Sequence, residues 1–414
     1  MHLHLQKSTV KSQPSEVRIT GSKSETNRLL LLRALYSTIT IANLSNSEDS
    51  AVMQKALEAP LENPRAVNVH HAGTAMRFLT AFFALQEGKE VLLTGSSRMK
   101  ERPIQILVEA LQQLGADISY EETEGFPPIK IKGKKLTQSC VSLPAHVSSQ
   151  YISALLLIAP KLANGLEVTL EGKITSVPYI KMTLALLETI GVETSFEGNR
   201  IKVNPKISVR KQQITVESDW SSASYWYSIV ALSEIGTQIT LSSYKKNSLQ
   251  GDAVLVEIYR DFGVETLFNE NSTITLSKVK ICERSTVNLQ LNNCPDIAQT
   301  IAVTCFGLGI GCDLSGLHTL KIKETDRLEA LKNELTKLGA EVAVTDESLH
   351  LKPSRSIHEN KTVKTYQDHR MAMAFAPLAL KVPVAIEDAE VVSKSYPDFW
   401  NDLKNNGFQI SATE

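Results

Sequence analysis

Short polar segments that carry basic side chains recur along the sequence, each beside an apolar segment. Arginine offers a planar guanidinium that binds carboxylate or phosphate through two hydrogen bonds at once, and lysine contributes a compact positive charge. The basic residues that we select are Lys23, Arg28, Arg98, Lys323, Arg327, Arg370 and Lys394. Their types and their recurrence predict an enzyme that binds small, multiply anionic ligands.

Neutral hydrogen-bonding groups occur at the same positions of the pattern. They are Ser24, Ser148, Ser149, Gln150, Ser176 and Tyr179. Gly73, in HAGTAMR, adds a position where the missing side chain allows an anion to approach the backbone. Several of these segments open apolar helices, whose N-terminal N–H groups and positive dipole end attract phosphate and carboxylate.

Two carboxylates, Asp296 and Glu324, stand in the same segments. KETDR places Lys323 and Arg327 four positions apart, so we expect both on one helix face with Glu324 beside them. Each residue also has a structural interpretation, because serine and aspartate often cap helices and an i, i+4 basic pair often faces solvent. Recurrence at one phase of a repeat favours the functional interpretation.

An apolar helix opened by a short polar group is the first recurring element. Its six copies begin at Thr26, Thr74, Ser149, Ser222, Asp296 and His369. From Thr74 onward, consecutive starts are 75, 73, 74 and 73 residues apart. The nearly continuous apolarity of these helices predicts that they are buried.

An amphipathic helix that ends at glycine and continues into a strand pair is the second recurring element. The glycines are Gly115, Gly191, Gly263, Gly339 and Gly407. Each is expected to cap its helix, because glycine readily adopts the left-handed conformation. Alternating segments such as ETSFEGNRIKV predict the hairpins. The chain is therefore expected to be an α/β protein of six repeats, each with two helices and about four strands.

Six repeats in 414 residues suit two lobes of three, because a chain of this length exceeds one ordinary core. We expect the first lobe at residues 20–217 and a second lobe that combines residues 1–19 with 218–414. The first repeat is the exception, since only 48 residues separate Thr26 from Thr74 and KALEAPLENPRAVNV has no capping glycine. We predict that this repeat has lost about one hairpin.

The composition argues against several classes of protein. With 44 Lys+Arg against 45 Asp+Glu, the chain has no global positive field for nucleic acid. No apolar run approaches the roughly 18 residues of a membrane span, and the N-terminal segment lacks the apolar core of a secretory signal. Five scattered cysteines are typical of reduced thiols, and His70–His71 has no third ligand at metal spacing. We expect a cytoplasmic monomer without metal or cofactor.

The motifs GSKSETNR, AGTAMR, RMKERP, SSQ, KETDR, DHRMAM and SKSYPDF, in this order, resemble those of the 5-enolpyruvylshikimate-3-phosphate (EPSP) synthase family. The resemblance runs from about Gly21 to Phe399, and the pair of KETDR with DHRMAM is specific. It implies a two-lobed inside-out α/β barrel, with three βαβαββ-type repeats in each lobe. It also implies transfer of the enolpyruvyl group of phosphoenolpyruvate to the 5-hydroxyl of shikimate 3-phosphate, in the shikimate pathway of aromatic amino-acid biosynthesis.

The resemblance further implies roles for individual residues. Shikimate 3-phosphate would contact Lys23, Ser24, Arg28, Ser148, Ser149, Gln150, Ser176, Tyr179, Asp296 and Lys323. Phosphoenolpyruvate would contact Lys23, Gly73, Arg98, Gln150, Arg327, Arg370 and Lys394. Asp296 would accept the proton of the 5-hydroxyl, and Glu324 would donate a proton to the methylene carbon, with Lys23 as a second candidate donor. The product would form through a tetrahedral ketal that loses phosphate.

Two other functions stay open at this point. The UDP-N-acetylglucosamine enolpyruvyl transferase of peptidoglycan synthesis is similar in GSKS and AGTAMR, but it relies on a reactive cysteine ahead of an Arg-Pro pair. Here SSRMK precedes the ERP segment and contains no cysteine. A non-catalytic repeat protein that binds phosphorylated ligands would need the basic residues but neither Asp296 nor Glu324.

Overall fold

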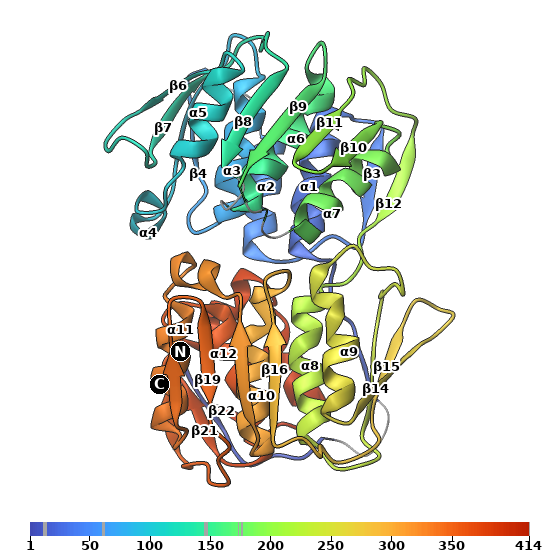
Figure 1. The fold of residues 1–414 in the computed structure, drawn as a ribbon, viewed down its shortest axis with the longest axis vertical. Coiled ribbons are helices and arrows are strands. Elements are labelled where there is room, and N and C mark those ends of the chain that lie inside the picture. Colours follow the sequence, from blue (N-terminus) through green and yellow to red (C-terminus); the bar gives the residue numbers. More distant parts are fainter. Residues whose placement is uncertain (11–14, 60–62, 145–147, 173, 175–176, 414) are drawn as a thin grey trace. The chain divides into compact units, whose positions relative to one another are not determined.

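The computed structural model describes residues 1–10, 15–59, 63–144, 148–172, 174 and 177–413. The chain divides into two compact units, one of Ser22–Val216 and one that joins Met1–Gly21 to Glu217–Glu414. Each unit has a separate hydrophobic core. The elements of both units can be followed in Figure 1.

The second repeat illustrates the fold of the unit Ser22–Val216. Its elements are β4 (Arg65–Asn68), α3 (Gly73–Ala84), β5 (Glu90–Thr94), the short α4 (Ser97–Lys100), α5 (Gln105–Gln113), β6 (Asp117–Tyr120) and β7 (Ile129–Lys132). The strand order is β4-β5-β7-β6. β4 runs parallel to β5, and β7 pairs antiparallel with both β5 and β6. This is a βαβαββ arrangement.

The third repeat has the same topology. Its elements are β8 (Cys140–Pro144), α6 (Ser149–Ile158), η1 (Ala159–Lys161), β9 (Leu166–Glu171), α7 (Val177–Thr189), β10 (Thr194–Glu197) and β11 (Arg200–Val203). The sheet order is β10-β11-β9-β8, with β8 parallel to β9.

The first repeat is shorter. It contains α1 (Lys23–Leu35), β3 (Ile39–Ala42) and α2 (Glu48–Glu58), and β12 (Gln212–Thr215) returns to pair parallel with β3. Within the described part of the chain this sheet has two strands and no counterpart of the β6–β7 hairpin.

The other unit contains three four-stranded sheets. The fourth repeat comprises α8 (Trp220–Leu232), β13 (Gln238–Leu241), η2 (Gly251–Val254), α9 (Leu255–Asp261), β14 (Val264–Phe268) and β15 (Ile274–Lys278). The fifth comprises β16 (Thr286–Gln290), η3 (Pro295–Ile297), α10 (Ala298–Leu308), β17 (Gly311–Ser315), η4 (His318–Ile322), α11 (Arg327–Lys337), β18 (Val342–Val344) and β19 (Ser348–Leu351). The sixth comprises β20 (Lys361–Val363), α12 (His369–Phe375), η5 (Ala376–Leu380), β21 (Val384–Ile386), η6 (Ala389–Lys394), α13 (Phe399–Asn405) and β22 (Ile410–Thr413).

The N-terminal segment completes two of these sheets. β1 (His2–Leu5) pairs antiparallel with β21 and β22, so the N and C ends lie close together in Figure 1. β2 (Ser15–Val17) pairs parallel with β13 and supplies the first strand of the fourth repeat. These pairings place residues 1–21 in the unit of residues 217–414, whereas the sequence analysis expected residues 1–19 there.

Local sequence explains the regular elements. The apolar helices are buried as predicted, and α10 has buried side chains along nearly its whole length. The five predicted capping glycines all have positive φ, from 80° at Gly191 to 105° at Gly407. An L-residue with a side chain is strained in that conformation, so glycine lets the helix end and the chain turn into the next strand.

Candidate active site

A buried arginine holds three carboxylates at the start of α11. The side chain of Arg327 is only 2% exposed. Its Nε donates to Asp368 Oδ2 at 2.6 Å, Nη1 donates to Asp296 Oδ1 at 2.8 Å, and Nη2 donates to Glu324 Oε2 at 2.8 Å. Burial works against the charge, but the three carboxylates outweigh it and raise the pKa of Arg327 above its usual value. Arg327 is therefore permanently cationic and joins both candidate catalytic carboxylates.

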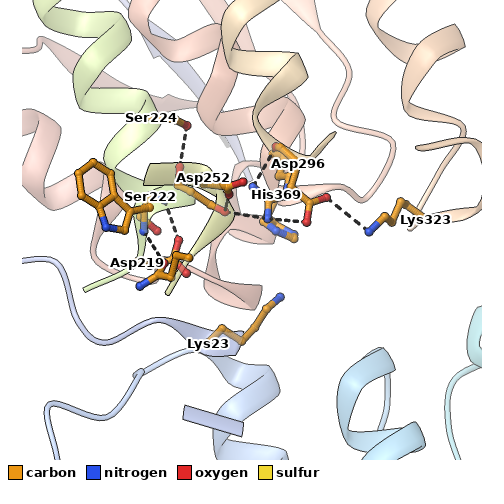
Figure 2. Close-up of polar contacts among 12 residues, drawn as sticks. Lys23, Asp219, Ser222, Ser224, Asp252, Asp296, Lys323 and His369 are labelled. Atoms are coloured by element: carbon orange, nitrogen blue, oxygen red, sulfur yellow. Dashed lines mark hydrogen bonds and ion pairs between the residues drawn. The ribbon is translucent and has the colours of Figure 1, made fainter. Parts of the chain in front are cut away.

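Asp296 lies among three basic side chains, those of Lys323, Arg327 and Arg370. Its Oδ1 is 3.5 Å from Lys323 Nζ. A dashed line joins these two side chains in Figure 2. Arg370 Nη2 is 3.5 Å from Oδ2, and Arg370 Nη1 donates to the backbone oxygen of Asp296 at 3.1 Å. The capping role that the sequence allowed for Asp296 is wrong, because Asp296 lies in η3 and the N-cap of α10 is Ile297. The carboxylate is thus available to the basic residues.

The KETDR segment does not form the expected helical face. Lys323 follows η4 directly, and α11 begins only at Arg327. Asp326 ends the intervening loop, because its carboxylate accepts hydrogen bonds from the backbone N–H groups of Leu328 and Glu329 and caps the helix. The prediction of an i, i+4 pair on one helix was therefore wrong, although Lys323 and Arg327 both reach Asp296.

Arg370 and Lys394 come from the sixth repeat. Asp368 caps α12 by accepting from the N–H of Arg370 at 2.8 Å, while it also binds Arg327. Lys394, at the end of η6, donates from Nζ to the backbone oxygen of Gln367 at 2.8 Å. Asp368 thus contacts the side chain of Arg327 and the backbone of Arg370. Its place before a helix in the sequence indicates only the second of these contacts, the helix cap.

A buried carboxyl group that sequence reasoning missed lies next to Arg370. Asp252, in η2, is 4% exposed and accepts a short hydrogen bond from Ser221 Oγ. Ser221 in turn accepts from Arg370 Nη2 at 3.3 Å. Burial raises the pKa of Asp252 to about 6, and the nearby charge of Asp296 adds to the rise. In the sequence, the one signal for Asp252 is its position just ahead of the second helix of its repeat. Lys323 has the same position in the fifth repeat.

Asp252 should make stability depend on pH. The folded protein holds the proton of Asp252 up to about pH 6, whereas an unfolded chain releases it near pH 3.8. The free energy of unfolding therefore falls as pH rises between these two values. The difference between the folded and unfolded pKa of Asp252 corresponds to about 3 kcal/mol, at roughly 1.4 kcal/mol per pKa unit. We expect Asp252→Asn, which cannot ionise, to gain about that much free energy of unfolding relative to wild type between pH 4 and pH 8. Urea unfolding of both proteins measures it, and parallel pH profiles would contradict it.

In the unit Ser22–Val216, Lys23 is the first residue of α1 and lies 3.2 Å from Asp49 Oδ2. Arg28, one turn further, is 2% exposed. It donates from Nε to Thr183 Oγ1 at 2.8 Å, from Nη1 to Ser24 O at 2.7 Å, and from Nη2 to Ser153 Oγ at 3.0 Å. Burial among these neutral groups lowers the pKa of Arg28 to about 10. Much of its hydrogen-bonding capacity therefore joins α1 to α6 and α7.

Four of the selected neutral residues, Ser148, Ser149, Gln150 and Tyr179, lie at the openings of α6 and α7. Ser148 caps α6 by accepting from the N–H of Gln150 at 3.4 Å. Gln150 Nε2 donates to Thr74 Oγ1 at 3.1 Å, which brings Gln150 next to the start of α3. Ser149 is buried, and the backbone oxygen of Tyr179 accepts from Arg28. Ser176 lies outside the described residues.

Arg102, rather than Arg98, lies against Gly73. A Cβ atom at Gly73 would be 2.6 Å from Arg102 Nη1, so a side chain there would displace the guanidinium at the end of the flexible Arg102 side chain. The side chain of Arg102 makes no hydrogen bond or ion pair with the described residues, and its backbone N–H donates to Met99 O at 3.1 Å. Arg98 instead pairs with Glu101 at 2.8 Å, and both side chains are largely exposed. The RMKERP motif predicts Arg98 at this place, because spacing alone does not separate its two arginines.

Arg77 supports the segment that carries Arg102. It is 4% exposed, and it donates from Nη1 to Gly73 O at 3.2 Å and from Nη2 to Pro103 O at 3.0 Å. Tyr151 Oη donates to the same Pro103 oxygen at 2.5 Å. Burial lowers the pKa of Arg77 to about 10, and the neighbouring charge of Arg102 contributes. The opening of α3 and the segment after α4 are thus fixed to each other.

Comparison with known proteins places this arrangement in a family. The model of the family described as EPSP synthase (3-phosphoshikimate 1-carboxyvinyltransferase) matches residues 58–403. A protein named 3-phosphoshikimate 1-carboxyvinyltransferase from Bacteroides fragilis is 44% identical over 412 residues, which covers 97% of this chain and 98% of the relative. The chain belongs to the EPSP synthase family.

Solved structures agree with the fold expected for an EPSP synthase family member. An EPSP synthase from Acinetobacter baumannii superimposes with a TM-score of 0.79 at 19% identity, covering 99% of this chain and all of that one. The enolpyruvyl transferase NikO from Streptomyces tendae gives a TM-score of 0.74 at 14% identity, covering 100% and 98%. The expected enolpyruvyl transferase fold is confirmed, and neither alternative function is favoured.

In the part of this family member that the structure describes, no group of three or more His, Cys, Asp or Glu side chains could hold a metal ion. Among the same residues, no helix is both long and apolar enough to cross a membrane.

Proposed function

We propose that this protein transfers the enolpyruvyl group of phosphoenolpyruvate to the 5-hydroxyl of shikimate 3-phosphate and releases phosphate. The observation that carries the proposal is the position of Asp296 between Lys323, Arg327 and Arg370. A carboxylate among three cations is placed to accept a proton from a substrate hydroxyl, while the cations bind the anionic groups of the substrates. Family membership supports the choice of substrates.

The reaction proceeds by addition and elimination. Asp296 accepts the proton of the 5-hydroxyl as its oxygen bonds to C2 of phosphoenolpyruvate, and the methylene carbon gains a proton. Glu324, which shares Arg327 with Asp296, is the proposed donor, with Lys23 as the second candidate. The tetrahedral ketal then loses phosphate from C2 and a proton from the new methyl group, which leaves the enol ether.

The remaining residues are proposed as substrate ligands. For shikimate 3-phosphate these are Lys23, Ser24, Arg28, Ser148, Ser149, Gln150, Ser176, Tyr179, Asp296 and Lys323. For phosphoenolpyruvate these are Lys23, Gly73, Gln150, Arg327, Arg370 and Lys394, and Arg102 replaces Arg98. No side chain of the described residues caps α3, so the backbone N–H groups at its opening and the Arg102 guanidinium together favour a carboxylate or phosphate.

Phosphate release tests the proposed function. Purified protein should release phosphate when phosphoenolpyruvate and shikimate 3-phosphate are both present, and should release none with either alone. Absence of release with both substrates would overturn the assignment. A scaffold that only binds phosphorylated ligands would show saturable binding of each ligand in the same experiment without turnover.

The two arginines of RMKERP make a matched pair for testing phosphoenolpyruvate binding. Arg102→Ala should raise the KM for phosphoenolpyruvate by about 10- to 100-fold, because a charge-assisted contact to an anion contributes about 1.5–3 kcal/mol. Arg98→Ala should leave KM within about twofold, because its exposed pair with Glu101 is worth little. Steady-state kinetics at saturating shikimate 3-phosphate measure both. Equal effects on KM, or a larger effect at Arg98, would contradict the choice of Arg102 over Arg98 as the phosphoenolpyruvate ligand.

We further propose that the protein acts as a cytoplasmic monomer. All five cysteines are free thiols, which fits a reducing compartment. The two units are proposed as the two lobes of the enzyme, with the chain crossing between them near residues 21 and 217. Size-exclusion chromatography with light scattering tests the monomer, and a mass of twice 45.6 kDa would overturn it.

A further inference from the structure

Arg370 is linked to Asp252 through one hydroxyl group. Ser221 Oγ accepts from Arg370 Nη2 at 3.3 Å and donates to Asp252 Oδ2. Ser221 lies near the start of α8, Asp252 in η2, and Arg370 at the start of α12. The fourth and sixth repeats therefore meet at this serine.

The charge of Asp252 determines which way the Ser221 hydroxyl donates its hydrogen bond. A serine hydroxyl has one proton, and an ionised carboxylate can only accept hydrogen bonds. With Asp252 ionised, the proton of Ser221 must point to Asp252, so the oxygen lone pairs face Arg370. A neutral group in place of Asp252 would free the hydroxyl to turn its proton toward the guanidinium, which would weaken the contact.

Asp252 makes this link at an energetic cost. Asp252 is 4% exposed, and its Oδ1 has no hydrogen-bond partner among the described residues. Burial raises the pKa of Asp252 to about 6. The charged or titratable groups that face it are Asp296, Asp219, Arg370 and Cys294. A buried carboxyl that lowers stability when ionised is the kind of group retained for function rather than for the fold.

We propose that Asp252, acting through Ser221, is a positioning residue that holds the Arg370 guanidinium in place for phosphoenolpyruvate. This inference rests on the proposed function, because it takes Arg370 as a phosphoenolpyruvate ligand. Three polar contacts hold the Arg370 guanidinium: Nη1 donates to Asp296 O, and Nη2 lies within 3.5 Å of Asp296 Oδ2 and donates to Ser221 Oγ. Without Ser221 or the charge of Asp252, the guanidinium can turn about its contact with Asp296.

A double-mutant cycle tests the proposal. The variants are Ser221→Ala, Asp252→Asn and the double variant, and the measurements are kcat and the KM for phosphoenolpyruvate at pH 5 and pH 8. At pH 8 each single variant should raise KM by about tenfold, the size of one charge-assisted hydrogen bond, with kcat changed less than about threefold. The double variant should be no worse than Ser221→Ala, because both changes break the same link.

The pH comparison separates a charge effect from a structural one. At pH 5 Asp252 carries its proton for most of the time in wild type, so the ratio of KM in Asp252→Asn to KM in wild type should fall toward one. This ratio also cancels the titration of phosphoenolpyruvate itself. Ser228→Ala is the matched control, because Ser228 is a buried serine on the same helix whose hydroxyl accepts from Thr304 and contacts no charged group among the described residues. It should leave KM unchanged.

Several results would overturn the positioning role while the wild type still releases phosphate. They are additive effects in the double variant, a KM ratio that does not depend on pH, and a folded Ser221→Ala with the KM of wild type. A wild type that releases no phosphate would instead overturn the proposed function. Circular dichroism of each variant establishes folding, and Ser221→Ala decides alone if Asp252→Asn does not fold.

Discussion

Arg327→Ala is expected to lower kcat/KM for phosphate release by about 10³-fold and to destabilise the fold by about 3–5 kcal/mol. The first effect follows because Arg327 is the proposed ligand of an anionic substrate and also holds Asp296 and Glu324. The second follows because the variant leaves Asp368, which is fully buried, without its charged partner. Steady-state kinetics and urea unfolding measure the two effects separately.

Two further variants test whether the losses of activity and stability come from the Arg327 contacts. Arg327→Lys keeps one positive charge but cannot reach three carboxylates in one plane, so it should recover part of the stability and little of the activity. Arg260→Ala is the control, because Arg260 forms an exposed pair with Glu257 and should change stability by less than about 1 kcal/mol. If Arg327→Ala matched this control in both measurements, the central place given to Arg327 would be wrong.

Asp296→Asn should lower kcat by about 10² to 10⁴-fold, the usual contribution of a general base, while the protein stays folded. An amide keeps the shape of the side chain and can accept the hydrogen bond of Arg327 Nη1, but it cannot take a proton from the 5-hydroxyl. Binding of shikimate 3-phosphate should weaken much less than kcat. Single-turnover kinetics and equilibrium binding together distinguish this outcome from a simple loss of affinity.

Asp326→Asn provides the matched control for this change. Asp326 caps α11 by accepting from the N–H groups of Leu328 and Glu329, and asparagine caps a helix as well as aspartate does. The same carboxylate-to-amide exchange, 30 positions further along the chain, should therefore leave kcat near that of wild type. Retention of full kcat in Asp296→Asn would argue for a non-catalytic role and against the proposed base.

The sequence by itself determined the regular elements and the family. Helix and strand periods follow from backbone geometry, so the apolar helices and alternating strands could be read locally. Glycine at a helix end has a local reason too, and the predicted caps, Gly115 among them, adopt positive φ. The ordered motifs indicated the EPSP synthase family, which the comparisons show.

Local patterns misled where two interpretations shared one spacing. KETDR suits a helical face, yet Asp326 competes by capping and starts α11 only at Arg327. RMKERP contains two arginines, and their sequence positions do not say which of them reaches Gly73. That choice depends on Arg77, which fixes Pro103 next to the start of α3.

Only the tertiary structure decided which distant residues meet. Asp296, Arg327 and Asp368 are separated by 31 and 41 positions, yet one guanidinium joins them. Asp252 looks like an ordinary helix-opening aspartate in the sequence, and it gains its role because η2 packs beside Ser221 and Arg370. Backbone periods act over a few residues, whereas contacts between repeats depend on how whole helices and sheets pack, so no local pattern could have predicted them.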